Sequence, residues 1–245
     1  MKDIQPYSRF AYIYNDVMDH INYDKWASFI LEASFPVRNP KSILDLGCGT
    51  GELLASFDDK ILKKVGLDTS RSMLEIALDN YPDINWIRGK IQNFKINDKF
   101  ELIICTHDTI NYLMDAKELR SHFQCVESHL EPDGYYCFDI SSEYNLLHNF
   151  HNKAFIKQMG DTRMTWENYY DKQNKVMTSI LSFAISEDNK EKNLKEVHMQ
   201  RYYSPEELEL ILFESGFIIK KKGSDYNQWK HNSHSCLINI LVKKR

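Results

Sequence analysis

The sequence lacks the features that mark several large classes of protein. Its five cysteines are an odd number and form no C-x-x-C pair, so neither a disulfide framework nor a zinc site is predicted. It contains no run of about 18 apolar residues, as a membrane span requires, and its first ten residues have no apolar segment of the kind found in a signal peptide. Glycine (9) and proline (6) are too sparse for disordered connectors. We therefore expect a cytoplasmic protein with no metal and no membrane segment.

A strong positive charge is also absent. Lys and Arg together number 31 and Asp and Glu number 35, which gives a formal net charge of −4. Phosphate contacts need clustered basic side chains, so no nucleic-acid partner is expected. A chain of 245 residues is long enough for one large α/β domain with a smaller insertion. These limits favour a protein that acts on a small molecule, with a homodimer as a compatible assembly.

Apolar runs alternate with helix-period segments between residues 41 and 140. This rhythm predicts βα units and a doubly wound α/β fold with a mostly parallel sheet. The strands are predicted over 42–46, 64–68, 84–87, 100–105 and 135–140, with a turn at Pro132-Asp133-Gly134 before the last of them.

Two further helices are predicted outside this rhythm. Near the N-terminus, apolar side chains between Tyr23 and Leu31 share one helical face. Near the C-terminus, Ser204-Pro205-Glu206-Glu207 combines an N-cap, a proline at the first helical position and a capping box, and Gly216 is suited to end the helix. Two closing strands are predicted over 217–220 and 237–242.

Residues from about 160 to 203 depart from the βα pattern, because apolar and polar side chains alternate there. A period of two predicts antiparallel strands, and we expect a small three-stranded insertion. The chain is therefore divided into an N-terminal helical cap (1–40), an α/β core (41–150 and 204–245) and an antiparallel β insertion (151–203). This insertion would serve as a lid or as an interface.

The segment Asp45-Leu46-Gly47-Cys48-Gly49-Thr50-Gly51 carries the strongest functional signal. It follows a predicted strand and opens a predicted helix, and its glycines allow a sharp turn on which a ligand can lie against bare main chain. A second acid, Asp68, ends the next strand, where a carboxylate can accept both hydroxyls of an adenosine ribose. The pattern predicts an adenosyl ligand at this edge of the sheet.

A nicotinamide dinucleotide is the rival ligand. Its fingerprint, G-x-G-x-x-G, would place a third glycine at position 52, but that position is Glu52. A carboxylate at the start of the helix opposes a diphosphate, whereas S-adenosylmethionine carries no phosphate. The spacing and the charge therefore favour the sulfonium cofactor.

The motifs of the core resemble those of class I S-adenosylmethionine-dependent methyltransferases. Residues 43–51, Ile-Leu-Asp-Leu-Gly-Cys-Gly-Thr-Gly, look like the first motif of that family, and residues 66–74 look like the second, with Asp45 and Asp68 at its acidic positions. Segments 14–26, 105–113 and 201–208 are similar to a bacterial small-molecule branch that includes amino-sugar N,N-dimethyltransferases. The resemblance implies a seven-stranded, Rossmann-like sheet and a methyl transfer to a small-molecule acceptor, at nitrogen or oxygen.

The resemblance also implies roles for single residues. Gly47, Cys48 and Gly49 would lie along the methionine part of S-adenosylmethionine, and Asp68 would hold the ribose. Around the rest of the cofactor the implied residues are Tyr23 over the methionine end, Thr69 and Met73 beside the adenine, Lys90 and Ile91 at the adenine edge, and Thr106 below the sulfonium. This branch commonly has an acid at the position of Lys90, and Gln92 or a backbone carbonyl would have to replace it.

The loop after residue 105 is the predicted acceptor side of the site, because ligands bind at the carboxyl ends of strands in open α/β sheets. His107 and Asp108 are candidates for proton handling, and Tyr14 and Tyr112 for lining the acceptor site. Simpler interpretations remain for both candidates: His107 as an exposed loop residue and Asp108 as the cap of the following turn. At the level of function, a non-catalytic cofactor-sensing or partner-binding module and an NAD-linked oxidoreductase remain as alternatives.

Overall fold

The computed structural model describes residues 1–187, 190–230 and 232–245. Its larger sheet has seven strands in the order β11-β12-β6-β5-β2-β3-β4. Strands β2 to β6 pair in parallel, and β12 is antiparallel to both β6 and β11. The strands are β2 (Ser42–Leu46), β3 (Lys63–Asp68), β4 (Asn85–Arg88), β5 (Phe100–Cys105), β6 (Leu130–Ser141), β11 (Phe217–Ser224) and β12 (Leu237–Lys244). The predicted doubly wound, mostly parallel α/β sheet is confirmed.

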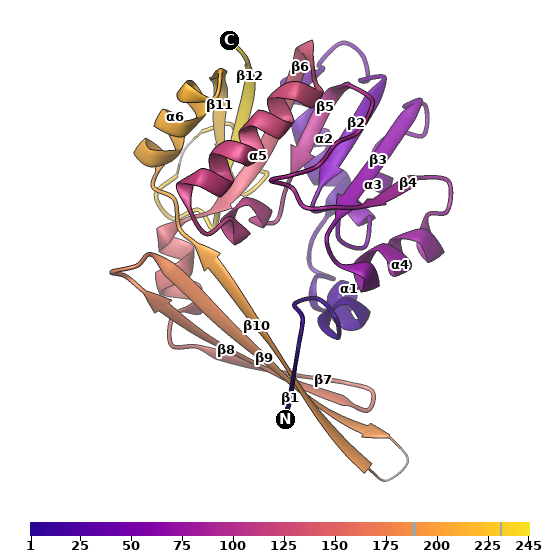
Figure 1. The fold of residues 1–245 in the computed structure, drawn as a ribbon, viewed down its shortest axis with the longest axis vertical. Helices are drawn as coiled ribbons and strands as arrows, with labels where there is room; N and C mark the ends of the chain where they lie inside the picture. Colours follow the sequence, from indigo (N-terminus) through magenta and orange to yellow (C-terminus); the bar gives the residue numbers. More distant parts are fainter. Residues whose placement is uncertain (188–189, 231) are drawn as a thin grey trace.

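Helices cover both faces of this sheet, as Figure 1 shows. Helices α5 (Ala116–His129) and α6 (Pro205–Glu214) pack on one face, and α2 (Tyr23–Ser34) and the short α3 (Glu52–Ala55) pack on the other. Alternate residues of each strand point to opposite faces and pack into two hydrophobic cores, one under α5 and α6 and one under α2 and α3. Leu44 belongs to the first core and Ile43 to the second, and both are fully buried. Because both faces are covered, the central strands carry continuous apolar runs.

The helix starts follow the local sequence. Ser204 accepts a hydrogen bond from the backbone N–H of Glu207, Pro205 takes the first helical position, and Gly216 after the helix has a φ of 85°. The predicted start and end of α6 are confirmed. Helix α4 (Arg71–Asn80) begins in the same way at Ser70, whose side chain accepts from the N–H of Met73.

A second sheet of five strands lies beside the first, in the order β1-β10-β9-β8-β7. Its strands are β1 (Lys2–Ile4), β7 (Ala154–Met159), β8 (Thr162–Asp171), β9 (Val176–Glu187) and β10 (Lys190–Arg201). The antiparallel pairing of β7 to β10 agrees with the period of two, but the expected three strands are too few. The N-terminal segment, predicted as a helical cap, also contains a strand, since β1 pairs in parallel with β10 and satisfies its free backbone groups.

The predicted turn at Pro132-Asp133-Gly134 is wrong as well. These residues lie within β6, where the pairing with β5 shifts register between Phe100 and Leu102. The irregularity absorbs the Pro-Asp-Gly segment without ending the strand. None of the helices within the described ranges is long and apolar enough to cross a membrane. The same ranges contain no group of three or more His, Cys, Asp or Glu placed to hold a metal ion.

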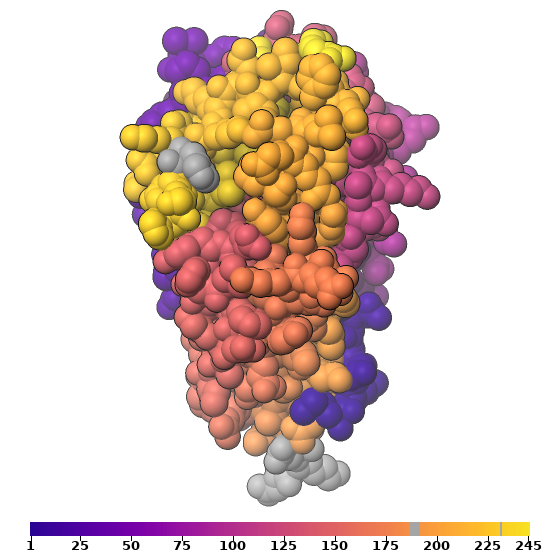
Figure 2. Space-filling model, turned by 90° about the vertical axis from the view of Figure 1, so that its left-hand side faces the viewer, coloured from indigo at the N-terminus to yellow at the C-terminus, as the bar shows by residue number. Residues whose placement is uncertain are grey.

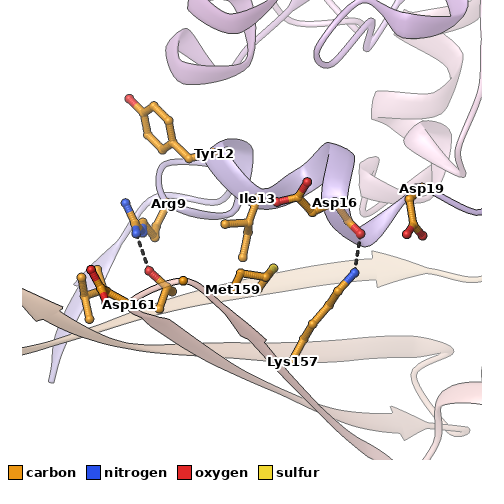
Figure 3. Close-up of a pocket in the computed structure, with 11 residues that line it drawn as sticks. Arg9, Tyr12, Ile13, Asp16, Asp19, Lys157, Met159 and Asp161 are labelled. Carbon is orange, nitrogen blue, oxygen red and sulfur yellow. Dashed lines mark hydrogen bonds between the residues drawn. The ribbon is translucent and has the colours of Figure 1, made fainter.

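The N-terminal segment joins the two sheets. After β1 it forms a 3-10 turn, η1 (Phe10–Ile13), and the single-turn helix α1 (Tyr14–Val17), which lie over β7 and β8 (Figure 3). Arg9 donates to the Thr162 hydroxyl at 2.6 Å, and Lys157 donates to the carbonyl of Asp16. The groove between these elements has a volume of about 710 Å³ and is lined by the N-terminal segment and strands β7 to β9, away from the larger sheet.

Figure 2 shows the opposite, outward side of the second sheet, which forms the lower half of that view. Several large apolar side chains of this sheet are exposed, including Tyr169 at 59% and Met199 at 47%. Their inward-facing neighbours are buried, Tyr170 at 2% and His198 at 5%. The sheet therefore has one face toward the rest of the molecule and one toward solvent.

Candidate active site

A cavity of about 510 Å³ opens at the carboxyl ends of β2, β3, β4 and β5. Its lining contains every residue that the sequence predicts for the cofactor: Tyr23, Asp45, Gly47, Cys48, Gly49, Asp68, Thr69, Met73, Lys90, Ile91 and Thr106. Tyr14, His107 and Tyr112 also line it. The predicted cofactor residues are therefore brought together from five separate segments of the chain, at the edge where such sheets bind ligands.

The glycine turn after β2 forms the floor of this cavity. Gly47 and Gly49 have φ angles of 78° and 54°, a region that favours glycine. The N–H of Gly47 donates to the carbonyl of Leu67 at 2.7 Å, which ties the turn to β3. A Cβ added at Gly47 would lie 2.4 Å from Thr109 Cγ2, whereas one at Gly49 would meet nothing within 4 Å. The turn leaves open space above bare main chain at Gly49.

Asp68 is fixed beside this turn by backbone donors. Its Oδ2 accepts from the N–H of Gly49 at 3.0 Å and its Oδ1 from the N–H of Ser70 at 2.7 Å. Burial raises the pKa of the Asp68 carboxyl, and the backbone hydrogen bonds oppose that rise. The side chain is thus held in one orientation at the end of β3, with its carboxylate on the cavity wall.

Asp45 is a second buried acid on the same wall. Only 2% of it is exposed, and its Oδ1 is buried without a hydrogen-bond partner. Burial, together with the nearby charge of Asp68, raises the pKa of Asp45 to about 8. A buried acceptor that lacks a partner is costly to leave empty, so this oxygen suits a donor or a cation supplied by a ligand.

Glu52 faces the same cavity from the first position of α3. Its carboxylate accepts from the Asn15 side chain and from the Tyr81 hydroxyl, each at 2.8 Å. The negative charge is therefore held beside the glycine turn, where a dinucleotide would place its diphosphate. This geometry fits a phosphate-free ligand.

The loop after β5 is strained and held by one residue that the sequence does not reveal. His107 and Asp108 have φ angles of 54° and 46°, which are uncommon for residues with a side chain. Their N–H groups donate to the two carboxylate oxygens of Asp139, at 2.9 and 2.5 Å, and the Tyr226 hydroxyl donates to the same carboxylate at 2.5 Å. Asp139 is fully buried, and burial raises its pKa to about 6. Asp139 thus fixes the loop that carries the predicted acceptor-side residues.

His107 lies among aromatic rings. Its ring centroid is 4.6 Å from that of Trp26 and 5.6 Å from that of Tyr23, and its Nε2 is buried without a partner. The interpretation of His107 as an exposed loop residue is therefore wrong. Burial lowers the pKa of His107 to about 4, so the imidazole is neutral near pH 7.

The simpler interpretation of Asp108 is also wrong. Its side chain makes no capping hydrogen bond to the turn η2 (Thr109–Tyr112) and instead accepts from Gln200 at 2.8 Å. Burial and the neighbouring Asp139 raise the pKa of Asp108 to about 7. The carboxyl therefore changes charge in the range where proton transfer is useful.

A second cavity, of about 290 Å³, lies between the loop after β5 and the inner face of the second sheet. Tyr7, Tyr14, His107 and Tyr112 line both cavities, so these four side chains form the boundary between them. The second cavity is otherwise lined largely by aromatic and apolar side chains together with Asp108, Ser141, Asn145, Ser179, His198 and Gln200. No Lys or Arg appears in its lining within the described part of the chain.

Sequence reasoning missed several residues of this site. Asp139 lies within an apolar strand, and Tyr7 precedes any periodic segment, so neither stood out. Glu196 and His198 are two positions apart on β10 and therefore share its inner face. No sequence signal marks this pair, because the apolar Val197 and Met199 occupy the alternate positions and predict the opposite face as the buried one, whereas the structure exposes them at 37% and 47%.

Comparisons with known proteins agree with this geometry. A methyltransferase-domain family model matches residues 43–134, the part that carries the glycine turn and both acids. A crystal structure of an S-adenosylmethionine-dependent methyltransferase from Clostridium acetobutylicum ATCC 824 superimposes with a TM-score of 0.84 at 29% identity, covering 97% of this chain and 98% of that one. YqeM of Bacillus subtilis (strain 168), whose name places it among the methyltransferases, is 28% identical over 233 residues, 94% of this chain and 93% of its own.

A shorter match points to one branch. The dTDP-4-amino-2,3,4,6-tetradeoxy-D-glucose N,N-dimethyltransferase of Saccharopolyspora spinosa is 34% identical over 94 residues, which cover 38% of each chain. The fold, the glycine turn with its two acids and the matches define the class: the chain is a class I S-adenosylmethionine-dependent methyltransferase, and S-adenosylmethionine is its cofactor. Within that class it resembles the branch that contains the amino-sugar N,N-dimethyltransferases. The predicted S-adenosylmethionine-dependent methyltransferase activity and its cofactor are confirmed, and they replace both the NAD-linked and the non-catalytic alternatives.

Proposed function

We propose that the protein methylates a small amine that binds in the second cavity. The observation that carries this proposal is the shared wall: Tyr7, Tyr14, His107 and Tyr112 are the side chains between the cofactor cavity and the second cavity. An acceptor in the second cavity would meet the methyl group at this boundary, as an in-line displacement requires.

The chemistry of the second cavity favours an uncharged or cationic acceptor. Its described lining has aromatic rings and the carboxyl of Asp108 but no Lys or Arg. Aromatic faces attract ammonium groups, whereas a phosphorylated or carboxylate acceptor would find no basic partner. The relatives named as amino-sugar N,N-dimethyltransferases support nitrogen over oxygen as the nucleophile.

For the cofactor we propose the arrangement that the resemblance implies. Asp68 accepts the ribose hydroxyls, and the main chain from Gly47 to Gly49 lies along the methionine part. From its buried Oδ1 without a partner, we further propose that Asp45 faces the methionine ammonium. The remaining contacts are Tyr23 at the methionine end, Thr69 and Met73 beside the adenine, Lys90 and Ile91 at its edge, and Thr106 below the sulfonium.

Lys90 cannot accept a hydrogen bond from the adenine amino group. The Gln92 amide nitrogen donates to Glu118 at 3.3 Å, and this leaves the Gln92 carbonyl oxygen as an acceptor on the cavity wall. We propose that Gln92 takes this role.

S-adenosylmethionine supplies the electrophilic methyl group, so the protein has to position the acceptor, exclude water and remove a proton. We propose that Tyr14 and Tyr112 line the acceptor, and that Asp108 and His107 face its nitrogen. Since His107 is neutral and its Nε2 lacks a partner, that atom suits a hydrogen bond from the acceptor N–H.

The second sheet forms the outer wall of the acceptor cavity, so we propose that segment 151–203 acts as a lid for the α/β core. Its inner residues Ser179, His198 and Gln200 line that cavity. The exposed outer face would leave room for the homodimer contact considered above, which analytical ultracentrifugation would test.

The experiment that tests the function has two stages. Native mass spectrometry of the purified protein should show retained S-adenosylmethionine or S-adenosylhomocysteine. Release of S-adenosylhomocysteine is then measured with benzylamine, tryptamine and the methyl glycoside of 3-amino-3-deoxyglucose, each against the alcohol of the same skeleton. Faster turnover of the amines than of the matching alcohols supports the proposal. Turnover of the alcohols alone would identify oxygen as the methylated atom instead. Cofactor binding without turnover of any compound would contradict the proposed acceptor class.

Cofactor affinity is expected to rise with pH up to about 8. The pKa of Asp45 is raised to about 8 before binding, so most of this carboxyl is protonated at pH 7. A cofactor ammonium beside Asp45 stabilises the ionised form, so binding releases a proton and the affinity strengthens as pH rises toward 8. Calorimetric titration with S-adenosylhomocysteine at pH 6.5 and 8 should show tighter binding at pH 8.

The matched control for this pH effect is Asp45→Asn, which removes the titrating group and keeps the shape of the side chain. Its affinity should be weaker and nearly independent of pH over this interval. An equal pH dependence in the variant would remove Asp45 from the ammonium site.

A further inference from the structure

A chain of four polar side chains runs from the second sheet to the boundary between the two cavities. The Tyr7 and Tyr112 hydroxyl oxygens are 2.8 Å apart, Tyr112 Oη is 2.9 Å from His198 Nδ1, and His198 Nε2 is 3.1 Å from Glu196 Oε2. Glu196 is fully buried and His198 is only 5% exposed. The two tyrosines, in contrast, line both cavities.

The hydrogen bonds of Glu196 set the direction of this chain. Its Oε1 accepts from the N–H groups of Arg9 and Phe10 at 2.6 and 3.0 Å, and its Oε2 accepts from the N–H of Tyr7 at 2.8 Å. A carboxylate surrounded by donors has only acceptor capacity to offer, so His198 donates its Nε2–H to it. With a single hydrogen on the imidazole, Nδ1 is the acceptor and takes the hydrogen of the Tyr112 hydroxyl.

The same logic orders the two tyrosines. With its own hydrogen directed to His198, Tyr112 Oη accepts from the Tyr7 hydroxyl. The oxygen of Tyr7 keeps a lone pair at the wall between the cavities. The order Tyr7, Tyr112, His198, Glu196 is therefore a continuous series of donors that ends at a buried carboxylate.

The position of Tyr7 is fixed from two sides. Its N–H donates to Glu196, its carbonyl accepts from the Ser70 hydroxyl at 3.0 Å, and its φ is 58°. A residue held in this uncommon conformation by two tertiary hydrogen bonds is characteristic of a functional position. Ser70 also caps α4, and its N–H donates to Asp68. The position of Tyr7 is therefore fixed relative to the cofactor side of the site.

We propose that this chain is a proton relay that deprotonates the acceptor amine, an inference that rests on the function proposed above. The acceptor ammonium gives one N–H proton to Tyr7 Oη, the Tyr7 proton passes to Tyr112 Oη, and the Tyr112 proton passes to His198 Nδ1. The N–H bond breaks and its electron pair becomes the lone pair of the amine, which then forms the new N–C bond as the C–S bond breaks toward sulfur. The net result before methyl transfer is a neutral amine and an imidazolium paired with Glu196.

In this scheme Tyr7 touches the acceptor, whereas His198 and Glu196 act through Tyr112. The arrangement repeats the logic of a catalytic triad, in which a carboxylate orients an imidazole and stabilises its protonated form. His107 has no such support, since its Nε2 lacks a partner. The relay therefore assigns proton uptake to the second sheet and leaves His107 to position the acceptor.

The first test requires no acceptor. Long-range ¹H–¹⁵N correlation spectra of protein labelled at histidine, with the signal of His198 assigned from its absence in His198→Gln, report the protonation of both ring nitrogens. The relay predicts a neutral His198 with hydrogen on Nε2 at neutral pH, and a changed Nδ1 shift in Tyr112→Phe. A His198 that carries hydrogen on Nδ1, or on both nitrogens in the resting protein, would overturn the relay.

The second test uses the amine with the highest turnover from the panel described above. Tyr112→Phe, Tyr7→Phe and His198→Gln should each lower kcat about 100-fold, the lower range for general acid–base catalysis, with KM and cofactor affinity changed less than about twofold. The double variant Tyr112→Phe/His198→Gln should be no slower than either single variant, because all act on one path.

Matched controls come from the exposed surface. Tyr169→Phe removes a hydroxyl from the outer face of β8, and His148→Gln changes an exposed histidine, so both should keep the kcat of the unaltered protein. Full kcat in Tyr112→Phe would overturn the relay while the methyltransferase function stands. Absence of amine turnover in the unaltered protein would instead contradict the proposed function, and the spectra would still decide the relay.

Discussion

Replacing Asp68 with alanine is expected to abolish measurable cofactor binding. The carboxylate is fixed at the end of β3 by two backbone N–H groups and stands on the wall of the larger cavity. Two hydrogen bonds from ribose hydroxyls to a charged acceptor contribute about 1.5–3 kcal/mol each. Their loss lowers the affinity about 10²- to 10⁴-fold. Calorimetric titration with S-adenosylhomocysteine would measure the change.

Two controls separate ribose binding from damage to the turn. Asp79→Ala removes an exposed carboxylate from α4 and should leave the affinity unchanged. His107→Ala alters the acceptor side of the site and should also bind the cofactor. Circular dichroism should show that Asp68→Ala keeps the native secondary structure at the temperature of the titration. A folded Asp68→Ala variant that binds as tightly as the unaltered protein would disprove the ribose assignment.

The second large effect is expected at Asp139, a residue remote from any predicted motif. Alanine at this position would leave the N–H groups of His107 and Asp108 and the hydroxyl of Tyr226 without their acceptor in a fully buried setting. Removal of one partner from a buried, charged hydrogen-bond network costs about 3–5 kcal/mol. Urea unfolding should show a fall of this size in the free energy of unfolding, at an unchanged m-value.

The comparison variant is Asp115→Ala, which removes the exposed N-cap of α5, where the side chain accepts from the N–H of Glu118 at 2.8 Å. A helix cap of this kind contributes about 1 kcal/mol. Equal losses in the two variants would show that the Asp139 carboxylate does not support the loop as described. Under conditions in which it remains folded, the Asp139→Ala variant should also lose methyl transfer activity, because His107 and Asp108 are no longer held in position.

Local sequence signals account for much of the larger sheet and for the cofactor side of the site. The glycine turn, Asp45 and Asp68 lie within 24 residues of sequence, from 45 to 68, and each belongs to a strand end that the apolar runs define. The cap and proline at Ser204 and Pro205 likewise determine the start of α6 through contacts within one helical turn. Such features can be predicted from the sequence because the interactions that form them join residues that are close together in the chain.

The remaining features depend on contacts between distant segments. Strand β1 forms only because β10 offers an unpaired edge, and no periodicity within three residues can indicate that. Asp139 holds a loop 31 and 32 positions earlier in the chain, and Glu196 binds amides 186 to 189 positions away. The acceptor side of the site is assembled mainly from such pairs, which explains why Tyr7, Glu196 and His198 escaped the sequence prediction.

The anchoring of the first ten residues by Glu196 has a consequence for synthesis on the ribosome. At about 5–20 residues per second, the N-terminal segment leaves the ribosome roughly 10–40 seconds before its partners on β10 exist. During that interval the nascent chain can already pair β2, β3 and β5, whereas Tyr7 has no carboxylate to hold it. The enzyme therefore gains its complete reaction chamber only once β10 has been synthesised and has captured β1.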